Sequence, residues 1–131
     1  MINKRKMQEH LKFMAILIAI DSIWLYGNFK EHKLQIESVQ KSPLKVDKLA
    51  GILFYVIAVI AHFKFIIPYS KTAEEAFKKG ALIGFLMYAT FDLTNKAIFS
   101  DYTWEYAIKD TLWGSFAIGL ASYFYHSVTY S

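Results

Sequence analysis

The second apolar run of the chain contains Ile52-Leu-Phe-Tyr-Val-Ile-Ala-Val-Ile-Ala61, with an apolar or small residue at every position. Coiled as a helix, this stretch is apolar around its whole circumference, whereas a helix of a soluble bundle buries only one stripe. Residues 116–121, Phe-Ala-Ile-Gly-Leu-Ala, have the same character. A soluble bundle is the strongest competing interpretation, because charged residues also occur in the apolar runs. Lipid accounts better for surfaces that are apolar on all sides.

The composition of the whole chain points the same way. Of its 131 residues, 55% are hydrophobic and 18% are aromatic, which is more apolar than an average soluble domain. A soluble domain of this size has a limited interior, so the surplus would form large apolar surface patches. Cysteine is absent, so a disulfide framework, a thiolate metal site and a cysteine nucleophile are excluded.

Four apolar runs are long enough to cross a bilayer, about 30 Å of hydrocarbon. The shortest, with nineteen residues, would extend about 28 Å as a helix. The sequence therefore predicts an all-α, polytopic membrane protein, with residues 1–131 forming one domain and four transmembrane helices in an up-and-down bundle. The predicted spans are residues 11–29, 49–69, 80–99 and 106–128.

The first run follows Lys4, Arg5 and Lys6, a pattern that a cleaved signal peptide also shows. Asp21 lies in the middle of the run, and no small-x-small cleavage pattern follows it. We therefore expect a retained helix.

The connection between the first two spans, residues 30–48, holds five lysines, three acids and Pro43. Its apolar residues Leu34, Ile36 and Val39 are too irregularly placed to predict an amphipathic helix. We expect a solvated loop or one that lies at the lipid headgroups. Positive charges are divided eight to seven between the two sides, so the multi-pass topology has no predicted orientation and no particular membrane is indicated.

Ionisable residues inside a span cost roughly 2.5 to 3.5 kcal/mol at the membrane centre, so they normally face the bundle interior or water. Asp21, Asp92 and Asp110 are such residues, one in each of three predicted spans. Because adjacent spans alternate in direction, all three carboxyls are expected in one half of the bundle. On the third helix Tyr88 and Asn95 share the face of Asp92. These five residues are the predicted binding or proton site.

Small and aromatic residues accompany the acids on the same helix faces. Glycines let neighbouring backbones approach closely, so a packing role is the more economical interpretation for them. The residues assigned to packing are Trp24, Trp113, Gly80, Gly84 and Gly114.

Clustered carboxyls in a low-dielectric interior are expected to be partly protonated, unless Lys96 or Lys109 pairs with them. The cluster is then either a hydrogen-bonded network that fixes helix packing or a cavity for a proton or a polar ligand. The sequence leaves both interpretations open. His62 and His126 lie towards the opposite end and are expected at the interface, outside this site.

Three motifs lie on these spans, namely Asp21-Ser-Ile-Trp24-Leu25, Tyr88-Ala-Thr-Phe91-Asp92-Leu93-Thr94-Asn95 and Asp110-Thr-Leu-Trp113-Gly114. In order and spacing they resemble a family of small bacterial predicted membrane proteins, a domain of unknown function. Its signatures are Asp-x-x-Trp-Leu, Tyr-x-x-Tyr-Asp-Leu-Thr-Asn and Asp-x-x-Trp-Gly, so Phe91 replaces the usual tyrosine. The resemblance extends over residues 14–123 and implies four spans and a membrane location, but no activity.

Three classes of function fit these features. The first is a small proton-linked transporter or a polar-ligand binding module that uses the acids. The second is a non-catalytic accessory subunit of a larger assembly, such as a respiratory complex, an ATP synthase or a virion membrane. An enzyme is the least favoured class, because the sequence has no His-x-x-x-His or Glu-x-x-His array.

The expected partner is the lipid bilayer, with self-association or a larger membrane complex left open. We expect no metal, no cofactor and no nucleic acid, since the lysines and arginine lie at the edges of apolar runs rather than on one face.

Overall fold

The computed structural model describes residues 3–130, which are mainly helical and contain no strand. The predicted all-α class is therefore confirmed. The elements are α1 (Lys4–Gly27), α2 (Phe29–Gln40), α3 (Lys48–Ala61), the π-helical turn η1 (His62–Ile66), the 3-10 turn η2 (Ile67–Tyr69), α4 (Ala73–Ile98) and α5 (Trp104–Tyr130).

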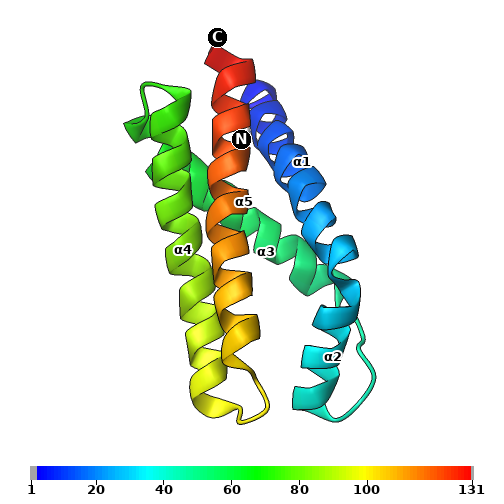
Figure 1. Ribbon diagram of the computed structural model, residues 1–131. Helices are drawn as coiled ribbons and strands as arrows, with labels where there is room; N and C mark the ends of the chain where they lie inside the picture. The colour runs from blue at the N-terminus through cyan, green and yellow to red at the C-terminus, as the bar shows by residue number, and fades with distance from the viewer. Residues whose placement is uncertain (1–2, 131) are drawn as a thin grey trace.

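The four long segments alternate in direction (Figure 1). Helices α1 and α4 run away from the end of the molecule where both chain ends lie, and α3 and α5 run back towards it (Figure 1). Helices α4 and α5 lie side by side as a long antiparallel hairpin, whereas α3 crosses behind them obliquely (Figure 1). We call the end with the chain ends the terminal end, and the opposite end, with α2 and the α4–α5 turn, the α2 end.

Glycines on both helices allow the close approach of α4 and α5. A Cβ atom on Gly84 would lie 2.5 Å from the Gly114 carbonyl oxygen, and one on Gly80 would lie 2.8 Å from the Ile118 carbonyl oxygen. A Cβ atom on Gly114 would in turn lie 2.0 Å from the ring of Tyr88. At these three glycines the backbone lies directly against the neighbouring helix, so a larger residue would force α4 and α5 apart.

The expected loop after the first span is in part wrong, because residues 29–40 form helix α2. The helix starts directly after α1, at a break where the Asn28 N–H still donates to the Trp24 carbonyl oxygen. Its apolar residues form no continuous stripe, and Leu34 is 69% exposed. The apolar pattern failed to predict this helix because a polar residue, Gln35, makes its main tertiary contact.

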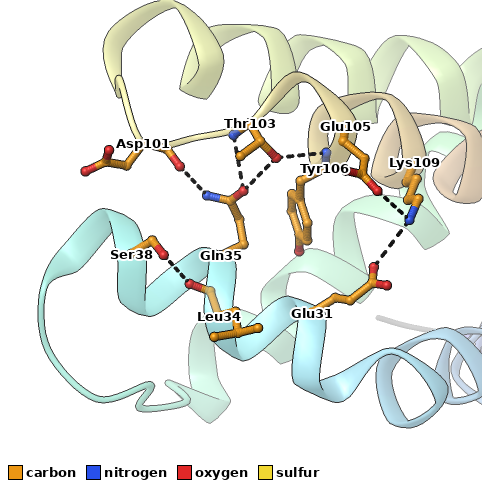
Figure 2. Close-up of a pocket in the computed structure, with 9 residues that line it drawn as sticks. All are labelled: Glu31, Leu34, Gln35, Ser38, Asp101, Thr103, Glu105, Tyr106 and Lys109. Carbon is orange, nitrogen blue, oxygen red and sulfur yellow. Dashed lines mark hydrogen bonds and ion pairs between the residues drawn. The ribbon is translucent and has the colours of Figure 1, made fainter.

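Gln35 joins α2 to the turn between α4 and α5 (Figure 2). Its amide nitrogen donates to the Asp101 carbonyl oxygen at 2.9 Å, and its amide oxygen accepts from the Thr103 N–H at 3.2 Å and hydroxyl at 3.1 Å. At the other end of α2, Lys109 lies between Glu31 and Glu105 (Figure 2). The side chain of Gln35 is buried, so these bonds hold α2 against the α2 end of the hairpin.

The core lies towards the terminal end, where α1, η1 and α5 meet. The Phe13 ring stacks on His62 with 3.7 Å between centroids, and Tyr125 meets the same histidine edge-on at 4.9 Å. The exposed fraction of His62 is 0%, so its ring is enclosed by the protein, and its depth at the membrane interface stays a prediction. Within the described residues neither nitrogen of its ring has a hydrogen-bond partner. His126, in contrast, is partly buried.

Two segments of the described chain, Lys4–Gly27 and Lys48–Tyr69, are long and apolar enough to cross a membrane. The outward faces of α3 carry large apolar side chains, among them Ile52, which is 58% exposed, and Ile57, which is 55% exposed. Helices α4 and α5 are longer than both segments, but polar residues lower their apolarity. The count of four spans therefore stays a prediction.

Candidate functional site

Asp92, on α4, is completely enclosed, with an exposed fraction of 0%. One carboxylate oxygen accepts a hydrogen bond from the Tyr102 hydroxyl, and the other accepts one from the Thr111 hydroxyl at 2.9 Å. Tyr102 lies in the turn before α5, and Thr111 lies on α5 itself. The carboxyl therefore joins α4 to two parts of the chain that follow it.

The pKa of the Tyr102 hydroxyl lies above its ordinary value, because the group is buried and donates to the Asp92 carboxylate. The tyrosine therefore remains protonated, and so a donor, throughout the physiological pH range.

Asp21, on α1, is also buried, at 6% exposure, and also accepts two hydrogen bonds. The Tyr55 hydroxyl donates from α3 at 2.5 Å, and the Trp113 indole N–H donates from α5 at 2.9 Å. Trp113 stacks on Trp24 of α1, with 5.4 Å between ring centroids and 12° between planes. The carboxyl thus connects α1, α3 and α5. Helix α3 makes few other contacts with the hairpin.

Asp110, on α5, differs from both of the other acids. It is 9% exposed, and within residues 3–130 no hydroxyl or backbone N–H donates to it; its nearest polar groups are the Asp92 carboxyl and the Trp24 indole N–H, both close enough to interact with it. The Trp24 N–H is buried and has no other partner within these residues, and Asp21 is the third acid nearby. Asp110 therefore has fewer donors from the protein than Asp21 and Asp92, each of which accepts two hydrogen bonds.

A pocket of about 480 Å³ opens beside Asp110, between α1, α2 and the hairpin. Its polar lining comes from Asp21, Tyr88, Tyr106 and His32 as well as Asp110. His32 Nδ1 lies 2.7 Å from the Tyr106 hydroxyl oxygen, so the two groups share a hydrogen bond across the pocket wall. The remaining wall is mainly apolar and aromatic, and consists of Trp24, Leu25, Tyr26, Phe29, Ile36, Leu44 and Val46. We call this the acidic pocket.

The five residues predicted as a site are thus divided. Asp21, Asp110 and Tyr88 line the acidic pocket, whereas Asp92 is sealed behind it. Tyr88 lies among all three acids, with its ring against Gly114. Asn95 is half-buried beside Tyr102 and is not part of the pocket wall.

Neither lysine expected near the acids pairs with them. The Lys109 amino group lies 3.0 Å from Glu105 and 3.7 Å from Glu31, both partly exposed carboxylates. The Lys96 amino group lies over the ring of Trp104. The three buried aspartates therefore have no cationic partner in the described part of the chain.

Several members of the site were not predicted from the sequence. Thr111 lies within the third motif but was not singled out there, and Tyr102 and His32 lie outside the predicted spans. One signal was readable, because Tyr55 is the one hydroxyl within residues 52–61 and a buried hydroxyl needs a partner. Its partner, Asp21, lies 34 positions earlier, and nothing in the local pattern identifies it.

The comparisons with known proteins place the chain in a family. The model of the predicted membrane protein family DUF2177 matches residues 7–126. The chain belongs to this family. It is therefore a membrane protein of a family of unknown function.

Curated proteins and solved structures gave no match. The family match covers all three buried aspartates and assigns a role to none of them. Among the described residues, no group of three or more His, Cys, Asp or Glu side chains could hold a metal ion.

Proposed function

We propose that the protein is a membrane-embedded binding module for an amphiphilic molecule with a cationic or hydrogen-bond-donating head group. The observation that carries the proposal is the Asp110 carboxyl, which is buried, accepts from no hydroxyl or backbone N–H in residues 3–130, and is located on the wall of the acidic pocket. A bound donor would complete the hydrogen bonds that the protein leaves open at this carboxyl.

The lining of the acidic pocket supports an amphiphile rather than a fully polar ligand. Its polar groups gather around Asp110, whereas Leu25, Phe29, Leu44 and Val46 form an apolar wall. Ligand sites are typically concave and mostly apolar with a few fixed polar groups, and 480 Å³ lies within their usual range of roughly 300 to 1,000 Å³. In a membrane protein, such a pocket suits a molecule that enters from the lipid.

Transport would require more than this pocket. Every lining residue of the acidic pocket belongs to the part of the molecule near the α2 end or to the middle of the bundle. A proton or solute path would also need polar groups towards the terminal end, where the core is an aromatic cluster around Phe13. Binding is therefore the part of the transport hypothesis that the geometry favours.

The proposal can be tested with a simple amphiphilic cation, dodecylamine. Protein in phosphatidylcholine nanodiscs is titrated with dodecylamine and, separately, with uncharged dodecanol, and the thermal unfolding midpoint is recorded. A ligand that binds the folded state raises this midpoint. We expect dodecylamine to raise it more than dodecanol, and Asp110→Asn to weaken dodecylamine binding about tenfold or more.

The matched control is Asp101→Asn, which removes an exposed carboxylate outside the acidic pocket. It should leave dodecylamine binding unchanged. Equal binding by the wild-type protein and Asp110→Asn would contradict the proposal. A folded protein that binds no cation but copurifies with large membrane subunits would instead favour the accessory role.

A further inference from the structure

A second pocket, of about 540 Å³, lies at the terminal end, far from the acidic pocket along the bundle. It is formed where the first turns of α1 meet η1, η2 and the last turns of α5. Its charged lining is mostly basic, with Arg5 and Lys6 from α1 and Lys64 from η1, and His10 adds a titratable ring. We call this the basic pocket.

The three cations of the basic pocket form no ion pair among the described residues. Within residues 3–130, no carboxylate forms an ion pair with Arg5, Lys6 or Lys64. The pocket contains one acid, Glu9, and one of its two carboxylate oxygens, Oε2, is already engaged. It accepts from the Tyr125 hydroxyl at 2.6 Å and pairs with Lys12 at 3.1 Å. The pocket thus keeps an excess of positive charge.

The other side of the basic pocket is apolar, and its side chains pack against the aromatic core. Phe63, Ile67, Tyr125 and Tyr130 line it. Phe63 and Tyr125 belong to the aromatic cluster around the buried His62, and their centroids lie 5.4 Å apart. The π-helical turn that contains Phe63 is a feature often found at functional sites.

We propose that the basic pocket binds the phosphate group of an anionic phospholipid. Arginine and lysine are the residues that recognise phosphate, and basic pockets between membrane helices are suited to lipid head groups. Arg5 and Lys6 precede the first predicted span, and Lys64 lies in the last third of the second, so all three are near head-group depth. The apolar side of the pocket, from Phe63 to Ile67, would contact the first carbons of the acyl chains.

A lipid and a free phosphate ion share the chemistry that this pocket recognises, so the test separates them. The protein is purified from nanodiscs with equal amounts of phosphatidylglycerol and phosphatidylcholine, and retained lipids are counted by native mass spectrometry. We expect phosphatidylglycerol to be retained several-fold over phosphatidylcholine. The triple variant Arg5→Gln/Lys6→Gln/Lys64→Gln should lose this preference.

The matched control is the triple variant Lys30→Gln/Lys33→Gln/Lys45→Gln, which removes the same charge from residues outside the basic pocket. It should keep the preference. An equal loss in both variants would overturn the proposal, because charge alone would then explain retention. Release of phosphatidylglycerol by millimolar inorganic phosphate would overturn the assignment to lipid. Thermal unfolding of both variants verifies that they are folded.

Discussion

Asp92 and Asp110 lie next to each other at the α2 end of the hairpin, yet their surroundings differ. Asp92 is sealed and accepts a hydrogen bond from a hydroxyl on each carboxylate oxygen, whereas Asp110 lines a pocket and has the Asp92 carboxyl and the Trp24 indole N–H as its nearest polar groups in residues 3–130. The comparison separates two interpretations of a buried acid, a packing contact and a binding group. We propose that in this protein each interpretation applies to a different residue.

We expect the largest loss of stability when both hydrogen-bond donors of Asp92 are removed. The double variant Tyr102→Phe/Thr111→Val would leave a buried carboxylate without partners. We expect the free energy of unfolding to fall by about 3 kcal/mol, since an unpaired buried charge is strongly destabilising. Unfolding in mixed micelles with increasing sodium dodecyl sulfate would measure it.

The control for this double variant is Tyr26→Phe/Thr90→Val, which removes a hydroxyl of each kind from exposed positions. Its effect should remain below about 0.5 kcal/mol. Equal losses in the two variants would show that Asp92 does not depend on its donors.

The contact between α4 and α5 holds the surroundings of Asp92 together, and we expect its disruption to cause the next largest loss of stability. A methyl group at Gly84 would meet the Gly114 carbonyl oxygen at 2.5 Å, so Gly84→Ala should destabilise the protein by about 2 kcal/mol. Gly51→Ala is the matched substitution on α3, where nothing lies within 4 Å of the added carbon. It should be neutral or stabilise the helix by up to about 1 kcal/mol. The same unfolding assay compares the two, and a neutral Gly84→Ala would contradict the packing role.

Helix α2 forms one side of the acidic pocket. Loosening this helix should therefore affect the pocket and leave the surroundings of Asp92 unchanged. Gln35→Ala removes three hydrogen bonds to the α4–α5 turn, and we expect a loss of about 1 kcal/mol. Amide hydrogen exchange should become faster in residues 29–40 but not in α4. Gln40→Ala, at the end of the same helix, bonds only to nearby residues and serves as control. Unchanged exchange in α2 would show that other contacts hold it.

We expect the exposed ion pairs of Lys109 to contribute least to the stability of the protein. Its side chain is 45% exposed, and those of Glu31 and Glu105 are 52% and 77% exposed, so solvent screens both pairs. Lys109→Gln should leave the free energy of unfolding essentially unchanged and dodecylamine binding intact. A larger effect on binding would mean that this lysine contributes to the acidic pocket.

The helices and the gathering of the acids could be predicted from the sequence, because both follow from local patterns. Apolar runs mark long helices, and polar residues inside them face inward. The expectation that Asp21, Asp92 and Asp110 share one half of the bundle followed from alternating helix directions, and the structure places them as neighbours.

The division of the acids could not be predicted, because it depends on contacts between distant residues. Asp92 is satisfied by Tyr102 from a turn, and Asp21 is satisfied by Tyr55 from α3. Helix α2 was missed for the same reason, since Gln35 docks it through hydrogen bonds rather than through an apolar stripe. The enclosure of His62 by an aromatic cluster could not be predicted either, because Phe13 and Tyr125 are distant from it in the sequence.

The most direct test of the account is to compare Asp92→Asn with Asp110→Asn, two substitutions of the same size on neighbouring carboxyls. The quantity measured is the free energy of unfolding of each variant in the same mixed micelles. We predict a loss of about 2 kcal/mol for Asp92→Asn, because an amide cannot accept from both Tyr102 and Thr111, and a loss of less than about 0.5 kcal/mol for Asp110→Asn. Equal losses, or a larger loss for Asp110→Asn, would contradict the division of the site into a sealed and an open carboxyl.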